Sequence, residues 1–223
     1  MSCILIAAVM SSGAQVYLQG GLNLATISKT NDGNVEKNNF LPTFNVGLLG
    51  RLGLSKNFDI ETGALLTGRG SNAETYFNGG ADYVKTRFNP FYIEVPVNAV
   101  VKIPVANGVK LFVHAGPYAA VGVFGKSSRE MKLGPLYSSE SSSIKFNNDD
   151  PFTSDQEDAA YDKLKRFDFG LNVGGGVEFK RLILKANYGF GLTKINSTES
   201  NNNANDKNKY RMLSFSVGIP LSH

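Results

Sequence analysis

Two histidines and a set of regularly spaced charged residues are the parts of this 223-residue chain that could do chemistry. His114 could act as a general base if Glu94 or Asp168 oriented its ring, because imidazole titrates near neutral pH and a carboxylate fixes its tautomer. No serine follows it to serve as a nucleophile, since the next residues are Ala115 and Gly116. The second histidine ends the chain and has no supporting motif.

Other catalytic and binding motifs are missing from the sequence. It contains no Gly-x-Ser-x-Gly motif, no cluster at metal-ligand spacing and no complete Gly-x-x-x-x-Gly-Lys-Ser phosphate loop. We therefore expect no catalytic residue, no cofactor and no metal site. The charged residues favour a structural network of interior ion pairs, because acids and bases are nearly balanced and buried charges need partners. This set is Arg51, Asp59, Glu61, Arg69, Glu94, Lys102, Lys110, His114, Arg166, Asp168, Glu178 and Lys185.

Apolar and polar residues alternate along the chain with a period of two. This alternation determines where the charged set lies. Side chains of a strand point to opposite faces in turn, so this period indicates a strand between two different environments. The charged set falls on the polar faces. The stretches that alternate are Val16–Ile27, Thr43–Leu54, Phe58–Arg69, Phe91–Ile103, Val109–Val121, Arg166–Phe179, Leu182–Thr193 and Arg211–Leu221.

These stretches favour strands that cross a membrane over strands of a soluble antiparallel sheet. Each has at least 11 residues, whereas an ordinary strand has about 5–6 and a tilted membrane strand about 9–11. A soluble eight-stranded barrel would also have little interior room for the apolar faces. The sequence thus predicts an all-β fold, an eight-stranded antiparallel up-and-down transmembrane β-barrel. The residues expected to face lipid are Val46, Leu48, Val97, Leu171 and Phe190.

Composition excludes two other classes of protein. Apolar residues make up 42% of the chain and the mean hydropathy is −0.15, and no run of about 18 apolar residues exists to form a membrane helix. The net charge of +4 comes from bases spread among acids, whereas nucleic-acid binding needs a basic cluster on one face. We expect neither a helical membrane protein nor a nucleic-acid partner.

The connections between the stretches alternate in length, as in barrels with long outer loops and short periplasmic turns. Ser55-Lys56-Asn57, Asn107-Gly108 and Lys180-Arg181 are tight turns, and Asn-Gly is a strong hairpin signal. This order places both termini on the periplasmic side. The long gaps, expected to be outer loops, are Lys29–Leu41, Ser71–Arg87, Gly125–Lys165 and Asn196–Lys209.

The longest gap, Gly125–Lys165, is the candidate recognition segment, because binding residues concentrate on loops carried by a rigid scaffold. Its acidic run, Asp149–Asp162, suits Ca²⁺ in composition but matches no defined calcium loop, so a Ca²⁺ site and a solvated acidic surface both stay open. Asp155–Lys165 could form a short helix with Ser154 as its N-cap. We expect deletion of Ser138–Asp158 to leave folding and insertion intact.

Residues 1–14 are expected to be an export signal, with the barrel domain covering residues 15–223. Ile4–Met10 is a short apolar core, and Ser12-Gly13-Ala14 places small residues before a cleavage site at Gln15. The basic region that normally precedes such a core is missing, so the start is misassigned or the sequence truncated; a buried first strand is the alternative. Cleavage would also remove Cys3, the single cysteine, and a cysteine-free chain suits an oxidising compartment.

Aromatic residues and prolines in the stretches lead to two finer predictions. Pro96 and Pro117 each predict a β-bulge, because proline cannot donate to a strand ladder and a closed barrel has no edge. Aromatic residues near the strand ends predict two belts at the membrane interfaces. The belts would consist of Tyr17, Phe58 and Phe179 at one end and Phe88, Phe91, Phe124, Phe167 and Tyr210 at the other.

Four short motifs occur in order along the stretches. They are Tyr92-Ile93-Glu94-Val95-Pro96, Gly116-Pro117-Tyr118, Phe167-Asp168-Phe169-Gly170-Leu171 with Gly174-Gly175-Gly176, and Tyr188-Gly189-Phe190-Gly191-Leu192-Thr193. Together they resemble the signature of PorT-type outer-membrane β-barrel proteins of Gram-negative bacteria, and the overall pattern covers about Val16 to Leu221. The chain departs from this pattern at its end, where such barrels commonly have an aromatic residue that the insertion machinery recognises. Phe215 is the candidate for that signal.

The resemblance implies an integral outer-membrane protein, usually without an assigned activity. Expected partners are outer-membrane lipid, the barrel-insertion machinery and an unidentified surface or secretion partner. We expect a non-enzymatic structural or surface-interaction role through the outer loops. One alternative is a narrow porin-like pore or a component of a transport or secretion assembly. Another is a lipid-modifying outer-membrane enzyme.

Overall fold

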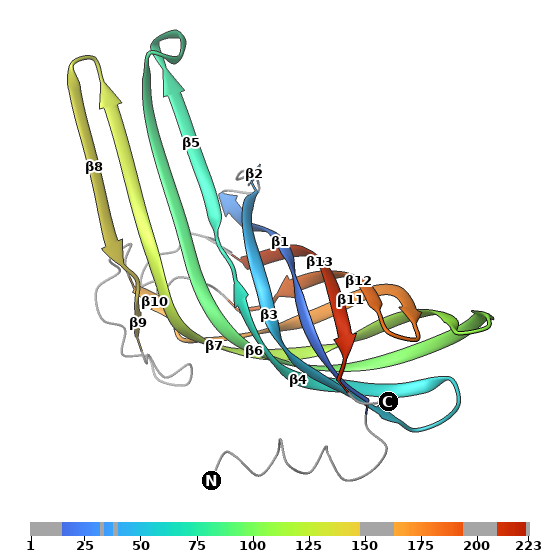
Figure 1. Cartoon of the computed structure of the whole chain (residues 1–223). Coiled ribbons are helices and arrows are strands. Elements are labelled where there is room, and N and C mark those ends of the chain that lie inside the picture. The colour runs from blue at the N-terminus through green and yellow to red at the C-terminus, as the bar shows by residue number, and fades with distance from the viewer. Residues whose placement is uncertain (1–14, 32–33, 38–39, 148–162, 194–208, 222–223) are drawn as a thin grey trace.

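A closed ring of antiparallel strands dominates the structure (Figure 1). The computed structural model describes residues 15–31, 34–37, 40–147, 163–193 and 209–221. Eight strands within these residues form the ring in the order β6-β4-β3-β1-β13-β12-β11-β7, and the pairing of β6 with β7 closes it. This confirms the predicted eight-stranded up-and-down barrel.

The strands of the ring correspond to the alternating stretches of the sequence, and three further strands extend the same sheet. The elements are β1 (Gln15–Asn31), β2 (Asn34–Lys37), β3 (Leu41–Gly53), β4 (Phe58–Gly68), β5 (Ser71–Phe77), η2 (Asn78–Gly80), β6 (Asp82–Ala106), β7 (Val109–Leu133), β8 (Leu136–Ser143), β9 (Lys145–Asn147), β10 (Lys163–Lys165), β11 (Phe167–Phe179), β12 (Ile183–Gly191) and β13 (Lys209–Pro220). No helix among the described residues is long and apolar enough to cross a membrane.

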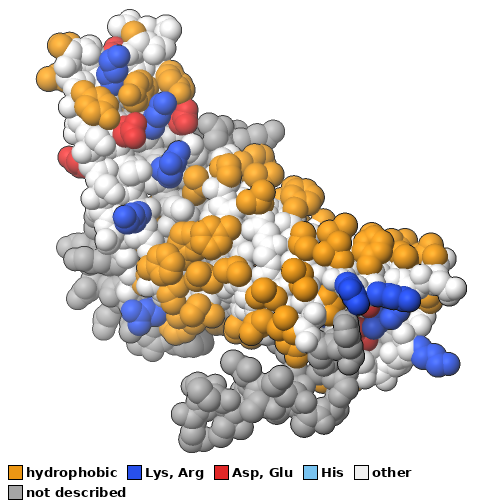
Figure 2. Space-filling model, in the orientation of Figure 1, with side chains coloured by type: hydrophobic (Ala, Val, Ile, Leu, Met, Phe, Trp, Pro, Cys, Tyr) orange, Lys and Arg blue, Asp and Glu red, His pale blue; other side chains and the backbone are white. Residues whose placement is uncertain are grey.

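The alternation of the sequence sorts side chains between the outer wall and the interior of the ring. On β3, Leu48 is 48% exposed while the adjacent Leu49 is 1% exposed. The residues predicted to face outward are all more than a third exposed, which confirms the facing: Val46, Leu48, Val97, Leu171 and Phe190. Figure 2 shows the resulting apolar band across the barrel wall. Charged side chains lie beyond the band at the upper left of the view and at its right-hand end.

The two ends of the barrel differ. The turns between β3 and β4, β6 and β7, and β11 and β12 are short and lie at one end, here called the short-turn end (Figure 1). Gln15 pairs with Arg51 and Tyr17 with Pro220, so the chain enters β1 and leaves β13 at this same end. The other end is called the mouth. The predicted export signal, residues 1–14, lies outside the described residues.

Several of the expected loops contain strands in the residues that the structure describes, which corrects the sequence prediction. The expected loop Ser71–Arg87 is a hairpin of β5 with β6, and β7 continues past Gly125 to pair with β8. Because β6 and β7 remain paired up to Tyr83 and Lys132, they form one four-stranded sheet with β5 and β8, here called the extension. It projects from the mouth in Figure 1. Both faces of the extension carry polar residues, so the sequence of these strands has no alternation of apolar and polar residues that would predict them.

Two described parts of the expected loop Gly125–Lys165, residues 144–147 and 163–165, lie at the mouth. Ile144 is 6% exposed, Leu164 is 2% exposed, and both join a buried cluster with Tyr92, Tyr118 and Tyr210. Phe146 stands edge-on against Tyr92, with ring centroids 5.5 Å apart. We call Ile144, Phe146 and Leu164 the mouth plug.

The helix predicted over Asp155–Lys165 is wrong where the structure describes it. Lys163–Lys165 form β10, which pairs in parallel with β9. The rest of that segment and the acidic run Asp149–Asp162 lie outside the described residues. Lys29–Leu41 includes β2, which pairs with β1, and most of Asn196–Lys209 also lies outside the described residues.

The prolines do not cause the expected bulges. The register of β6 with β7 is the same on both sides of Pro96 and Pro117, and it shifts instead between Phe91 and Tyr92 and between Pro104 and Ala106. The sheet thus tolerates the two missing N–H groups without an inserted residue. The aromatic belts are corrected in part. The Tyr17 and Tyr210 side chains are buried inside the barrel and Phe88 packs against the cluster that contains Tyr210, whereas Phe124, Phe167 and Phe179 are exposed.

Candidate functional site

The lumen near the short-turn end is occupied by a cluster around Arg51. The guanidinium donates from Nε to Glu61 Oε2 at 2.9 Å and from Nη1 to Glu178 Oε2 at 2.8 Å. Glu61 also accepts from Lys185 and, at 2.6 Å, from the Tyr17 hydroxyl. These side chains come from strands on opposite sides of the ring. The cluster therefore spans the interior and ties distant strands together.

A second cluster surrounds Arg69 below the mouth. Arg69 is ion-paired with Glu94 and with Asp168, and all three side chains are buried. The Tyr118 hydroxyl donates to Asp168 at 3.0 Å and accepts from Arg69 at 3.2 Å. Thr193 donates to the other Asp168 oxygen at 2.8 Å. The mouth plug packs against the tyrosines around this cluster, so apolar side chains cover the ion pairs.

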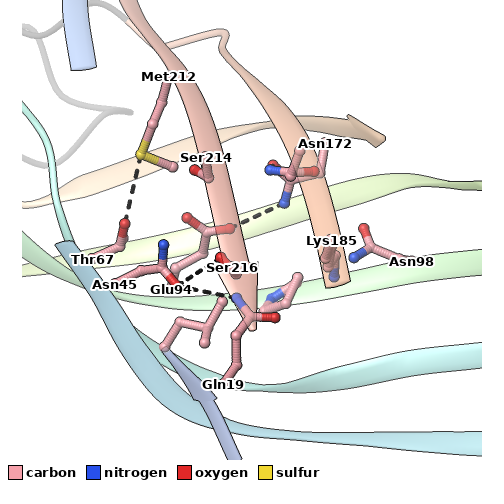
Figure 3. A pocket seen from close by; sticks show the side chains of 13 residues that line it. Gln19, Asn45, Thr67, Glu94, Asn98, Asn172, Lys185, Met212, Ser214 and Ser216 are labelled. Carbon is pink, nitrogen blue, oxygen red and sulfur yellow. Dashed lines mark hydrogen bonds between the residues drawn. The ribbon is translucent and has the colours of Figure 1, made fainter. Parts of the chain in front are cut away.

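Neutral amides fill the space between the two clusters. Asn172 donates to Glu94 at 3.0 Å, Asn98 donates to Glu61 at 3.1 Å, and Asn45 donates to Asn23 at 2.6 Å. A cavity of about 20 Å³ remains among these groups (Figure 3), and such a volume has room for about one water molecule. The described part of the lumen is packed with side chains and contains no wide channel.

The remaining residues of the predicted charged set lie as follows. Lys102 Nζ pairs with Asp59 at 2.5 Å, and Lys110, whose side chain is 44% exposed, lies 3.7 Å from Glu178. Arg166 is half-buried at the mouth, and its Nε is without a partner among the described residues. The structure brings the others into the two clusters, apart from His114.

His114 does not meet a carboxylate. Its Nε2 lies 2.9 Å from the Asn187 amide oxygen, and its Nδ1 has no hydrogen-bond partner among the described residues. The alternative in which Glu94 or Asp168 orients this ring is therefore wrong. Glu94 and Asp168 both form ion pairs with Arg69, and His114 is 2% exposed inside the lumen.

The charged set omitted the uncharged residues that link the clusters. Tyr17, Asn23, Asn45, Asn98 and Asn172 are all buried and hydrogen-bonded inside the barrel. A signal was present, because the alternation places Asn45, Asn98 and Asn172 on the same faces as the charged residues. Tyr17 gave no such signal, since an aromatic side chain at a strand end suits a membrane belt equally well.

The extension is the second candidate site. Its two hairpin tips are joined by a hydrogen bond of 2.6 Å from the Gly134 N–H to the Asp82 carboxylate. Large apolar side chains are exposed there: Tyr76, Phe77, Leu133, Leu136 and Tyr137. Tyr76 lies beside Lys85 and raises its pKa above the ordinary value, so the ammonium stays charged. The extension thus presents a fixed apolar tip above a charged sheet.

Among the described residues, no three His, Cys, Asp or Glu side chains come close enough to hold a metal ion.

Comparison with protein families gives one match, over residues 10–197, to the family described as outer membrane protein beta-barrel domain. No curated protein matches the chain.

Several solved structures resemble the chain at low sequence identity. Ail, the attachment invasion locus protein of Yersinia pestis, is 17% identical, with 94% of this chain and 99% of that chain covered and a TM-score of 0.42. Neisserial surface protein A is 14% identical, with 93% and 99% covered and a TM-score of 0.43. The outer membrane protein OprG from Pseudomonas aeruginosa is 10% identical, with 95% and 97% covered and a TM-score of 0.37.

Proposed function

Because the chain belongs to the outer membrane protein beta-barrel domain family, we propose that it is a non-enzymatic outer-membrane barrel with a closed lumen and a surface-recognition extension. The apolar wall faces lipid, and the extension stands outside the cell. The termini and short turns are periplasmic. The single observation that carries this proposal is the contrast between a lumen filled by ion pairs and an exposed, ordered extension.

The PorT-type assignment is part of this proposal, and the Arg69 cluster supports it. Each of the four sequence motifs contributes a residue to that cluster: Glu94, Tyr118, Asp168 and Thr193. Tyr92 of the first motif adds its ring, whose centroid is 5.3 Å from the Arg69 guanidinium carbon. Four motifs that are far apart along the chain thus meet around one buried cation, which gives a physical reason for them to occur together.

A closed lumen is favoured over a pore by the way the interior is filled. Arg51 and Arg69 each reach across the barrel, and the mouth plug covers the outer end. Eight strands leave an interior just wide enough for side chains. A porin-like pathway would require both clusters to break, and a buried ion pair that loses one partner costs about 3–5 kcal/mol.

Conductance across a planar bilayer tests the closed lumen. The purified barrel should give no stable channel of nanosiemens size. A variant carrying Ile144→Ser and Phe146→Ser is the comparison, because it loosens the mouth plug while both arginine clusters remain. Stable nanosiemens conductance by the unaltered protein would show that the lumen is open and would favour the pore.

The orientation can be tested by labelling single cysteines on intact cells. With Cys3 replaced by serine, Ser139→Cys on the extension should react with a membrane-impermeant maleimide, because residue 139 is exposed. Asn57→Cys in the β3–β4 turn should react only after the outer membrane is permeabilised. The opposite labelling pattern would show that the barrel has the reverse orientation, and the extension could then not act at the cell surface.

A further inference from the structure

The outward face of the extension continues the lipid-facing wall of the barrel. The alternation on β6 is not interrupted between Ile93 and Lys85, because the bulge at this level falls on β7, where Phe91 pairs with Phe124 and Tyr92 with Gly122. Phe91 stacks on Phe124 with ring centroids 4.9 Å apart, and Phe124 is 52% exposed. This aromatic pair is the outer edge of the apolar wall.

The two faces of the extension differ in charge. Residues that pair across the strands share a face, so the register separates the side chains of residues 71–88 and 126–143 into two sets. The outward face carries four basic and two acidic residues, an excess of two positive charges: Lys85, Arg87, Lys126, Lys132, Glu74 and Glu130. The inward face carries Arg129 with Asp82 and Glu140, an excess of one negative charge.

The outward face also contains a polar hollow. Its volume is about 170 Å³, against about 20 Å³ for the cavity in the lumen. It is lined by Asn72, Glu74, Lys85, Arg87, Ser128 and Glu130. Glu74 is held by Asn72 at 3.2 Å and by Tyr76 at 2.7 Å. Among the described residues, Arg87 and Glu130 have no side-chain hydrogen bond or ion pair.

The hollow begins just above the level of phospholipid headgroups, where a larger, sugar-bearing headgroup would reach it. Arg87 is four residues beyond Phe91 on the same strand, which is about 13 Å at roughly 3.3 Å per residue. A strand tilt of about 40° reduces this to a height of about 10 Å. A bilayer's polar region adds about 5–8 Å to each side of the hydrocarbon core, and a sugar-bearing headgroup extends further. Lys126 lies one row closer to the lipid than Arg87.

We propose that this hollow binds the phosphorylated sugar headgroup of a glycolipid in the outer leaflet that surrounds the barrel. Arg87 in the lining of the hollow and Lys126, which lies outside the lining and one row nearer the membrane, face the phosphate, since guanidinium and ammonium groups form strong charge-assisted hydrogen bonds to it. Glu130, Ser128 and Asn72 face the sugar, whose hydroxyls need acceptors as well as donors. The proposal rests on the orientation given above, which the cysteine labelling tests separately.

Native mass spectrometry of the full-length protein in detergent tests the phosphate contact. The probes are bis-phosphorylated lipid A, its dephosphorylated form and phosphatidylglycerol. Arg87→Gln should weaken binding of phosphorylated lipid A about tenfold, the scale of one charge-assisted hydrogen bond. Arg129→Gln is the matched control, because Arg129 is an exposed arginine on the inward face of the same sheet. Equal effects of the two substitutions, or no effect of either, would overturn the proposal.

Glu130→Gln distinguishes sugar recognition from a general attraction of anions. If Glu130 accepts sugar hydroxyls, its substitution should weaken lipid A binding while strengthening phosphatidylglycerol binding, because a negative charge has been removed. Stronger binding of both lipids would show that the face attracts any anionic lipid and would overturn the sugar contact. The Arg87 and Glu130 side chains have no hydrogen bond or ion pair with the described residues, so each variant should keep the heat-modifiable electrophoretic mobility of a folded barrel.

Discussion

Replacing Arg51 with methionine should destabilise the folded barrel by about 3–5 kcal/mol, because the substitution leaves buried carboxylates without their shared cation. Arg51 is 1% exposed and bonds to both Glu61 and Glu178. Its guanidinium carbon also lies 4.4 Å from the centroid of the Phe112 ring. Methionine keeps an apolar stem of similar length, so the loss is mainly that of the charge and its hydrogen bonds.

The stranded charge is chiefly that of Glu178. Glu61 keeps Lys185, Tyr17 and Asn98 as partners, whereas Glu178 keeps only Lys110 at 3.7 Å among the described ion pairs. Adding Glu178→Gln to the Arg51→Met variant should therefore recover about 0.5–3 kcal/mol, the usual coupling between contacting residues. No recovery would place the loss in packing rather than in the uncompensated charge.

Lys110→Met is the matched control for Arg51→Met, since it also removes a cation from Glu178. The Lys110 side chain is 44% exposed, so its removal should cost about 0–1 kcal/mol, as for exposed ion pairs. Urea titration in lipid vesicles measures both variants, followed by circular dichroism because the chain has no tryptophan. If the two substitutions have equal effects, the closed ion-pair network is not what stabilises the lumen.

Three further predictions concern the wall, the strand spacing and the extension. Leu48→Arg should cost about 2–4 kcal/mol at a lipid-facing site, and unchanged folding in bilayers would refute the facing. Gly47→Ala should destabilise the barrel because a Cβ there would lie 2.1 Å from the Ala64 carbonyl oxygen, whereas Gly20→Ala, with no atom within 4 Å, should be neutral in the same urea titration. Replacing residues 129–140 by a short turn should leave insertion intact, whereas deleting residues 138–158 should impair it because Ile144 and Phe146 of the mouth plug are lost; equal insertion in a protease-protection assay would contradict this.

The last of these predictions reverses an expectation from the sequence. A polar gap of about 40 residues between two alternating stretches suggested a loop that could be removed. The structure shows that part of the gap is strand and that Ile144 and Phe146 pack on the lumen. A lone isoleucine or phenylalanine in a polar segment has no period, so sequence reasoning could not place it against tyrosines of distant strands.

Local sequence determined the strands of the ring and the face on which each side chain lies. Alternation with a period of two depends only on neighbouring residues, and the contrast between lipid and lumen makes it strong on β3, β6 and β11. For the same reason the charged residues could be assigned to the interior. The extension could not be predicted in this way, because polar residues lie on both of its faces and leave no alternation between apolar and polar positions.

Which charges meet was decided only by the tertiary structure. Arg69 pairs with an acid 25 residues away and with another 99 residues away, and Arg51 bonds to Glu178, 127 residues away. Those partners follow from the register of each strand pair and from the closure of the ring. Register and closure depend on the packing of all eight strands together, so no short segment of the sequence specifies them.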